Sequence, residues 1–358
     1  EITVYIIALI ILYSFIITIN KPKYGLGITL IALVLSSVNF LPHWLNWNFT
    51  GYDQKDDWSD ITNLYSGLNQ LEPGRIMWEP NSDLNKYGTP MVLMTIPMFT
   101  NHESVEGLYF DSSITTPFHF VTVSGVAESP SNPVGGLSYI NGDFDRGVRY
   151  MKELGVDYFI SYTDSITDKA IMSDELENLF QSSPFTVFKI NSDKVQVVDT
   201  ELVNFSQPEL FERISNSIFK QEKTDSFFNI AMKEFILDNK KRIIEGIDTE
   251  ESQIQNRLPS KKSEINNVRI SNNEITFETE HPNELHIVKV SYFPNWTIEN
   301  GSGPYRLSPS FMGVIPYSNE VSMTFENTSL EKSLNIISLI IFLLTAYLLV
   351  FRIKKYAE

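Results

Sequence analysis

Three long apolar runs and one long mixed segment set the organisation of the chain. The runs cover residues 2–19, 24–45 and 334–351, and each is long enough to cross ~30 Å of hydrocarbon as a helix. Basic residues lie beside them, at Lys21 and Lys23 between the first two runs and at Arg352, Lys354 and Lys355 after the third. Because basic flanks stay in the cytoplasm, the pattern predicts a multi-pass protein of the cell membrane. Residues 46–333 would be extracytoplasmic and the C-terminus cytoplasmic.

The first apolar run would cross the membrane from outside to inside. The chain begins Glu1-Ile2-Thr3, without Met. We therefore expect further spans upstream, which makes this chain part of a larger polytopic protein; a removed signal peptide that left the terminus outside is the alternative. The run itself does not fit a signal peptide, because basic residues follow it rather than precede it.

The first part of the outer block alternates between helical and strand patterns. Apolar residues at spacings of three and four predict helices over 57–71, 143–155 and 174–181. β-Branched and aromatic runs predict strands over 75–79, 91–96 and 156–162, and then a hairpin of 185–190 with 194–198. Residues 97–139 keep no period and are rich in Pro, Gly and aromatics, which predicts a packed, irregular, functional loop. Together these patterns predict an α/β domain over residues 46–200.

The second part of the outer block changes from helical to strand periodicity. Two amphipathic helices are predicted over 208–220 and 225–246, forming a helical insert at 207–246. Over 267–327 the period becomes two, with turn residues between the apolar stretches, which predicts a β-sandwich. The expected fold is therefore α/β plus β-sandwich extracytoplasmic domains anchored by transmembrane helices. The sandwich domain would cover residues 201–330, and residues 331–358 would form the last span and a basic tail.

Composition narrows the classes of partner. The chain has 44 acidic and 28 basic residues, a net charge of −16, and five of the basic residues flank the spans. A surface this acidic repels phosphodiester backbones, which excludes a nucleic-acid partner, and it disfavours lying flat on anionic lipid. The chain has no Cys, so there is no disulfide framework, thiolate metal site or thiol nucleophile.

The segment 103–120 holds the strongest candidate binding site. Within it, carboxylates, hydroxyls, an aromatic ring and an imidazole lie close together in sequence, at Glu103, Glu106, Tyr109, Asp111, Thr115, Thr116 and His119. A sugar needs such groups, because carboxylates accept hydrogen bonds from its hydroxyls and a flat ring covers its C–H face. The His adds proton transfer or a metal bond. The alternative is a loop that fills the space between domains, with its polar groups satisfied by backbone.

Two smaller constellations have simpler explanations beside the functional ones. Arg75 on the strand 75–79 suits a phosphate through its planar fork, but it is more simply paired with Glu79 or a neighbouring acid. Asp53, Asp56 and Asp57 beyond the second apolar run could hold a divalent cation, Mg²⁺ or Mn²⁺, that bridges a lipid-linked phosphate. A solvated loop with Asp57 capping the next helix explains them as well.

Several strings in the chain resemble one family. The longer strings are VSYFPNWT at 290–297, GPYRLSPSFM at 303–312 and VIP at 314–316, and shorter ones lie at 75–79, 106–113, 115–120 and 130–134. They resemble the C-terminal region of large prokaryotic integral membrane proteins labelled "6-pyruvoyl-tetrahydropterin synthase-related". These proteins are similar to the GT-C class of glycosyltransferases. Pterin-synthase chemistry is not implied, because this chain lacks the His-rich zinc site which that chemistry needs.

The resemblance implies a GT-C-type membrane protein that moves a sugar from a polyprenyl-phosphate carrier outside the cell. In that class the catalytic carboxylate lies in the first outer loop, upstream of this chain. The expected partners are the lipid bilayer, a lipid-linked sugar, a glycan acceptor and the upstream membrane part of the same protein. The competing expectation is a non-catalytic cell-envelope scaffold or carbohydrate-binding membrane subunit.

Overall fold

The computed structural model describes residues 42–55, 57–107, 116–133, 139–198, 201–205, 241–245 and 265–357, together with Tyr13 and Leu137. For residues 116–117, 201–205, 241–245 and 349–357 it describes the backbone alone. The chain forms two compact units. Unit 1 consists of Glu1–Leu71 and Asn81–Thr100, and unit 2 consists of Glu72–Pro80 and Asn101–Glu358. The predicted spans 2–19 and 24–45 lie almost wholly outside the described residues.

Unit 1 is built around one amphipathic helix, α3 (Trp58–Leu68), which confirms the helix expected over 57–71. Its buried face packs against short helical turns: η1 (Tyr52–Gln54), η2 (Ser82–Tyr87), η3 (Val92–Thr95) and α4 (Ile96–Phe99). The strand expected over 91–96 is therefore wrong. Val92, Leu93 and Ile96 are buried together at helical spacing, and Pro97 in the first turn of α4 has no N–H to give to a sheet.

A five-stranded sheet forms the first layer of unit 2, in the order β2-β1-β3-β5-β4. The strands are β1 (Arg75–Trp78), β2 (Glu103–Ser104), β3 (Tyr158–Ser161), β4 (Leu176–Ser182) and β5 (Phe185–Ile190). The first three are parallel to one another, and β5 is antiparallel to both β3 and β4. The strands expected over 75–79 and 156–162 are thus confirmed.

Two details of this layer differ from the sequence pattern. The helix expected over 174–181 is the edge strand β4, since pairing with β5 outweighs the helix propensity of a Glu- and Leu-containing segment. The hairpin expected between 185–190 and 194–198 does not form. Instead β6 (Val195–Val197) pairs with a strand of a different sheet, β11 (His286–Ser291).

Three helices accompany the five-stranded sheet: α5 (Thr116–Val126), α6 (Phe144–Glu153) and α7 (Asp164–Met172). Helix α6 confirms the prediction over 143–155, with the Asp143 side chain accepting a hydrogen bond from the Arg146 N–H at its start and Gly155 at φ +67° after its end. Helix α5 corrects the prediction of an irregular segment over 97–139. From Phe118 to Val126 it is buried at every residue but Phe120, polar ones included, so it has no amphipathic period to read.

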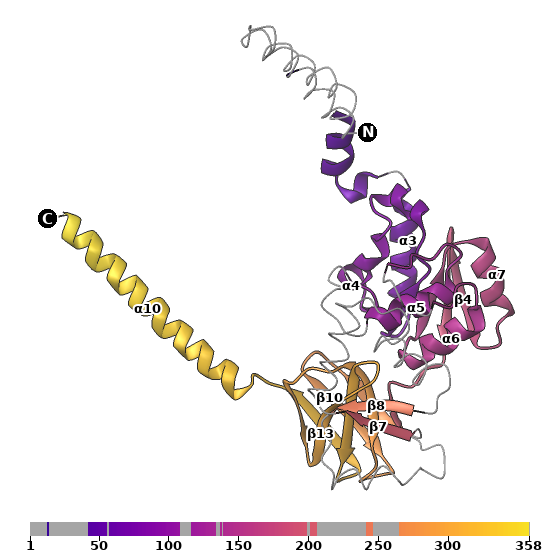
Figure 1. The fold of residues 1–358 in the computed structure, drawn as a ribbon. Helices are drawn as coiled ribbons and strands as arrows, with labels where there is room; N and C mark the ends of the chain where they lie inside the picture. Colours follow the sequence, from indigo (N-terminus) through magenta and orange to yellow (C-terminus); the bar gives the residue numbers. More distant parts are fainter. Residues whose placement is uncertain are drawn as a thin grey trace. The chain divides into compact units, whose positions relative to one another are not determined.

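Helices α5 and α6 lie side by side (Figure 1), and each has a glycine at the contact. A Cβ built on Gly125 would lie 2.9 Å from the Asp143 carbonyl oxygen and 3.0 Å from the Gly147 Cα. A Cβ on Gly147 would lie 2.5 Å from a methyl group of Val126. The two helices therefore need glycine at both positions.

Two further sheets complete unit 2 in a sandwich-like arrangement. One has the order β12-β15-β10-β9 and the other the order β6-β11-β14-β13-β8-β7. Their strands after residue 260 are β9 (Ile265–Ile270), β10 (Glu274–Thr279), β11 (His286–Ser291), β12 (Trp296–Glu299), β13 (Gly301–Leu307), β14 (Phe311–Pro316) and β15 (Glu320–Phe325). The period-two pattern over 267–327 therefore identifies real strands.

The six-stranded sheet is buried on both faces. Val288, Met312 and Val314 share one core with Ile275 and Phe277 of the four-stranded sheet. Alternate residues of the same strands join the core of the α/β layer, namely Leu285, Ile287, Leu307, Phe311 and Ile315 beside Met77, Phe118, Phe159 and Phe188. The α/β layer and the sandwich are thus continuous through one sheet, and the boundary expected near residue 200 falls inside unit 2.

The region of the predicted helical insert lies mostly outside the described residues. Its last part, Lys241–Glu245, is strand β8 rather than helix, and β8 pairs in parallel with β7 (Glu201–Phe205). The helix expected over 225–246 is therefore wrong at this end. The β-branched pair Ile243 and Ile244 completes a sheet ladder that the helical period alone does not reveal.

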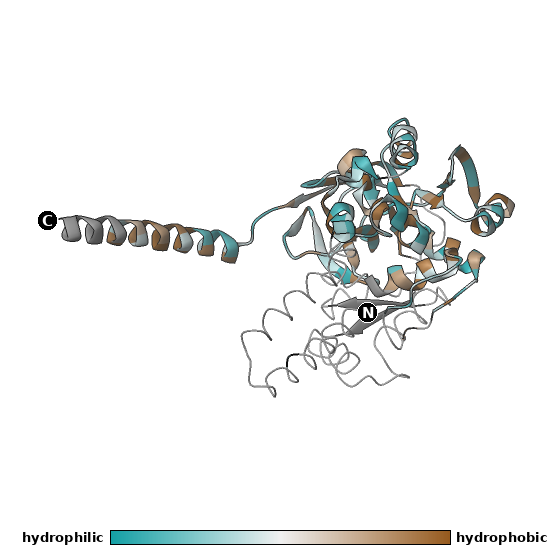
Figure 2. Cartoon of the chain, turned by 90° about the horizontal axis from the view of Figure 1, so that it is seen from above, coloured by the Kyte–Doolittle hydropathy of each residue, from teal (hydrophilic) through white to brown (hydrophobic). Residues whose placement is uncertain are grey.

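The last element is the long helix α10 (Ser329–Ala357). It begins with a capping box, in which the Thr328 hydroxyl accepts from the Glu331 N–H at 3.2 Å while the Glu331 carboxylate accepts from the Thr328 N–H at 2.7 Å. Polar residues at its start give way to apolar ones (Figure 2). Ser329–Leu348 is long and apolar enough to cross a membrane, and none of this stretch is buried against the described chain. It contains most of the run expected over 334–351.

Candidate functional site

A cavity of about 410 Å³ lies in unit 2 where the five-stranded sheet meets the sandwich. We call it the inter-sheet pocket. Its lining combines polar and apolar groups, including Arg75, Glu103, Ser104, His119, Asn272 and Trp296. These residues come from β1, β2, α5, the β9–β10 turn and β12. Three of them, Arg75, Glu103 and His119, are among the site residues expected from the sequence.

Arg75 closes one side of the pocket, but most of its guanidinium is committed to structure. Its Nη1 donates to the carbonyl oxygens of Leu154 and Lys289, both at 2.8 Å. Its Nη2 lies 3.3 Å from Glu103 Oε2. The side chain is 13% exposed whereas that of Glu103 is 59% exposed. Glu103 therefore offers the more accessible polar group of the pair.

Arg75 is one of three cations that close the C-terminal end of α6. Lys289 Nζ donates to the Lys152 carbonyl oxygen at 2.8 Å, Arg75 to that of Leu154, and Lys194 to that of Gly155. Cations at this position satisfy the unpaired carbonyls and the negative end of the helix dipole. Lys194 also lies 2.6 Å from Asp157 Oδ2. Burial, and then the charge of Arg75, lower the pKa of Lys194 from 10.5 to about 8.

His119 is the least satisfied polar group of the pocket. It lies on α5 and is 4% exposed, and its Nε2 is 3.5 Å from Glu106 Oε2. Neither ring nitrogen has a hydrogen-bond partner within the described chain. A buried polar group without a partner costs about 1–3 kcal/mol. A ligand that offers a hydroxyl would remove this cost.

Part of the pocket lining comes from the sandwich. Trp296 on β12 is 6% exposed and meets Phe325 edge to face, with ring centroids 5.4 Å apart. Val290 and Phe311 extend the same apolar wall. Beside them Asn272, exposed in the β9–β10 turn, adds an amide. The sequence strings around 290–297 and 303–312 suggest a family resemblance, but their spacing does not reveal that they meet the 103–120 segment.

Glu79 is placed away from this pocket. It is fully buried, and its Oε2 accepts from the Tyr162 and Thr163 N–H groups at 2.9 Å each. Its Oε1 accepts from the Thr163 hydroxyl at 2.8 Å and from the Glu128 N–H at 3.3 Å. The carboxylate therefore holds the loop that starts α7. Of the two partners expected for Arg75, Glu79 or a neighbouring acid, the structure has the neighbouring acid, Glu103.

The remaining expected site residues are less defined. Tyr109, Asp111 and Thr115 lie outside the described residues, and only the backbone of Thr116 is described, as the first residue of α5. Of the acidic cluster, Asp56 lies outside them too. Asp57 Oδ2 is 3.7 Å from Lys86 Nζ, and its side chain does not cap α3. The described chain contains no group of three or more side chains suited to Mg²⁺, Mn²⁺ or another metal ion.

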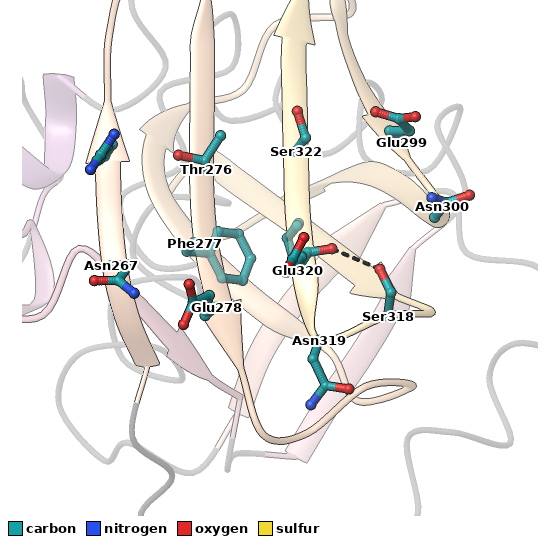
Figure 3. Close-up of a pocket in the computed structure, with 12 residues that line it drawn as sticks. Asn267, Thr276, Phe277, Glu278, Glu299, Asn300, Ser318, Asn319, Glu320 and Ser322 are labelled. Atoms are coloured by element: carbon teal, nitrogen blue, oxygen red, sulfur yellow. Dashed lines mark hydrogen bonds between the residues drawn. The ribbon is translucent and has the colours of Figure 1, made fainter.

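A larger hollow of about 890 Å³ lies on the outer face of the four-stranded sheet (Figure 3). Thr276 and Glu278 on β10 lie beside Ser322 and Glu320 on β15. The three acidic side chains Glu278, Glu299 and Glu320 are all exposed. This is the hydrated face expected of an antiparallel sheet whose other face is packed, and the one aromatic residue that lines it, Phe277, is buried in the sandwich core. We therefore place the candidate site at the inter-sheet pocket.

Comparison of the chain with protein-family models, with curated proteins and with solved structures finds no match.

Proposed function

We propose that this chain is the C-terminal extracytoplasmic and membrane portion of a multi-pass GT-C-like glycosyltransferase that acts on lipid-linked sugars in cell-envelope glycan or glycoprotein assembly. The inter-sheet pocket binds a glycan, and the catalytic carboxylate belongs to the upstream part of the same protein. One observation carries the proposal: the buried ring of His119 has no hydrogen-bond partner in the described chain and lines a cavity with both polar and apolar walls.

The lining of the pocket suits a sugar. Glu103 and Asn272 provide accessible hydrogen-bonding groups, while Trp296 and its apolar neighbours provide a surface for C–H groups. The volume of about 410 Å³ falls within the ~300–1,000 Å³ of small-molecule sites. His119 Nε2 lies 3.5 Å from Glu106 Oε2, so a sugar hydroxyl bound at the ring would have a carboxylate close by.

A non-catalytic carbohydrate-binding or scaffold subunit is the second candidate. It is favoured by the roles of Arg75 and Glu79, whose polar atoms are largely engaged in holding α6 and α7. In this version the pocket still binds a glycan, but no transfer follows.

Binding is tested with the full chain in lipid nanodiscs. The probes are polyprenyl-phosphate-mannose, polyprenyl-phosphate-glucose and the corresponding free oligosaccharides, measured by calorimetry. His119→Ala and Asn272→Ala should each weaken binding about tenfold, since each removes about one hydrogen bond to the ligand. Met172→Ala is the matched control, because Met172 is 83% exposed and lies outside the pocket. The proposal fails if no probe binds, or if the pocket variants bind like the control.

Transfer is tested separately with the full-length protein. Release of polyprenyl phosphate from the sugar-loaded carrier should fall in Glu106→Gln and His119→Ala, while the thermal midpoints of both variants stay near that of the parent protein. Binding without any release would favour the non-catalytic subunit. Equal loss of stability in both variants would show instead that the pair is structural.

A further inference from the structure

Unit 1 exposes a group of large apolar side chains on its described surface. Phe49 is 78% exposed and Met98 is 76% exposed, and Tyr52, Trp44, Met91 and Phe99 are between 54% and 39% exposed. Soluble proteins rarely leave such side chains together without a partner. We call this group the unit 1 apolar surface.

The surface joins two segments that are distant in sequence. The ring of Phe99 stacks on Tyr65 of α3 at 5.6 Å and meets Tyr52 edge to face at 5.9 Å. The side chain of Asn69 donates to the Phe99 carbonyl oxygen at 3.1 Å. These contacts fix the end of α4 beside the segment that follows residues 42–49, which are helical.

The short helix α4 separates its residues between inside and outside. Ile96 is fully buried against α3, whereas Met98 two residues later projects outward. The Tyr65 hydroxyl lies 2.6 Å from Thr95 Oγ1, which ties the start of α4 to the same helix. The outward direction of Met98 is therefore set by packing on its opposite side.

We propose that the unit 1 apolar surface rests on the lipid bilayer, with Met98, Phe99 and Phe49 inserted at the boundary between headgroups and acyl chains. The chain itself points to this partner, because helical residues 42–49 continue directly from the apolar run 24–45. Trp44 and Tyr52 supply the rings that favour the membrane interface. The proposal does not depend on glycan binding.

The charges of unit 1 indicate the kind of lipid. Its two described cations outside the helical residues 42–49 are both engaged: Lys55 Nζ lies 4.0 Å from the centre of the Trp47 ring, and Lys86 lies within 3.8 Å of the carboxylates of Asp57 and Asp60. An amphipathic surface that binds anionic lipid would carry free basic residues. The surface therefore fits neutral or zwitterionic headgroups and is held by apolar burial.

The absence of Cys from the sequence allows a direct test. Met98→Cys is labelled with the environment-sensitive fluorophore NBD and the full chain is placed in phosphatidylcholine nanodiscs, with and without doxyl-labelled phosphatidylcholine. Met172→Cys on α7 is the control, as an equally exposed methionine in unit 2. Insertion by ~5–10 Å should shift the emission of the label at 98 to the blue and give at least about threefold more quenching than at 172.

A second labelled position guards against a local artefact. Phe49→Cys should give the same shift and quenching as Met98→Cys, because the proposal inserts both of these exposed side chains into the bilayer. Equal quenching at 98 and 172 would overturn the proposal. So would a blue shift at 98 that occurs in cell membranes but not in phosphatidylcholine nanodiscs, since a protein partner would then cover the surface.

Discussion

His286 makes the stability of the sandwich depend on pH. The side chain lies on β11 and is fully buried. Its Nδ1–H donates to the Glu284 carbonyl oxygen at 2.8 Å, and its Nε2 accepts from the Thr279 hydroxyl at 2.7 Å. This pair of hydrogen bonds suits the neutral ring. Burial lowers the pKa of His286 from 6.5 to about 4, although the bond to Glu284 acts in the other direction.

The sign and the size of the effect follow from this shift. Between pH 6.5 and 4 the unfolded chain binds a proton at this position and the folded chain does not, so acid favours unfolding. The free energy of unfolding should fall by about 1.4 kcal/mol on going from neutral pH to about pH 5.5, and by about 2.5 kcal/mol at about pH 4.5. Above the ordinary pKa of 6.5 the contribution is complete and constant.

The assay compares the parent protein with His286→Gln. Gln keeps a donor and an acceptor of similar reach but does not titrate, which makes it the suitable comparison. At neutral pH the substitution should lower the free energy of unfolding by about 1–2 kcal/mol, because it alters packing and hydrogen-bond geometry. Denaturant unfolding in detergent at several pH values gives the free energy of unfolding of both proteins. The difference between them should change by about 2.5 kcal/mol as the pH falls to about 4.5, so the variant should be the more stable protein at that pH. A difference that stays constant with pH would refute the reasoning.

Two further predictions concern Lys194 and Gly125, which are both in unit 2. For Lys194, whose pKa is lowered to about 8, the unfolded chain keeps the proton above this value while the folded chain gives it up, so stability should rise with pH between 8 and 10.5. Relative to Lys194→Met, the free energy of unfolding of the parent protein should rise by up to about 2 kcal/mol by about pH 9.5, as measured by denaturant unfolding. Free energies of unfolding that change in parallel with pH in the two proteins would contradict this. Gly125→Ala should destabilise unit 2 by about 1–3 kcal/mol, because the new methyl group meets the backbone of α6. Gly107→Ala, whose new methyl group would meet no atom of the described chain within 4 Å, is its control and should be nearly neutral in the same denaturant unfolding; equal losses would show that the helix contact does not matter.

Elements with one buried face could be predicted from the sequence. Helix α3 buries Ile61, Leu64, Tyr65 and Leu68 at spacings of three and four, and the sandwich strands alternate because only one side of the four-stranded sheet is packed. In each case the environment differs between the two sides of the element, and this difference leaves a period in the chain.

Elements buried on every side, or paired with distant strands, could not be predicted in this way. Helix α5 is surrounded by core residues, so its sequence has no polar face and its pattern does not predict a helix. Strand β4 has helix-forming residues, yet it pairs along the edge of β5. Strand β6 follows β5 closely in sequence, but its partner is β11, about 90 residues further on. Local propensity contains no information about these partners.

The candidate site divides in the same way. The sequence alone determined that the chain carries a long apolar helix near its C-terminus, an acidic surface and a polar, aromatic segment around His119. The tertiary structure decided that Arg75 pairs with Glu103 while Glu79 holds α7. It also decided that Trp296 and His119 line one pocket. The physical reason is that burial and hydrogen-bond satisfaction depend on strands that are distant in sequence, whereas hydrophobic periodicity and charge are local properties of the chain.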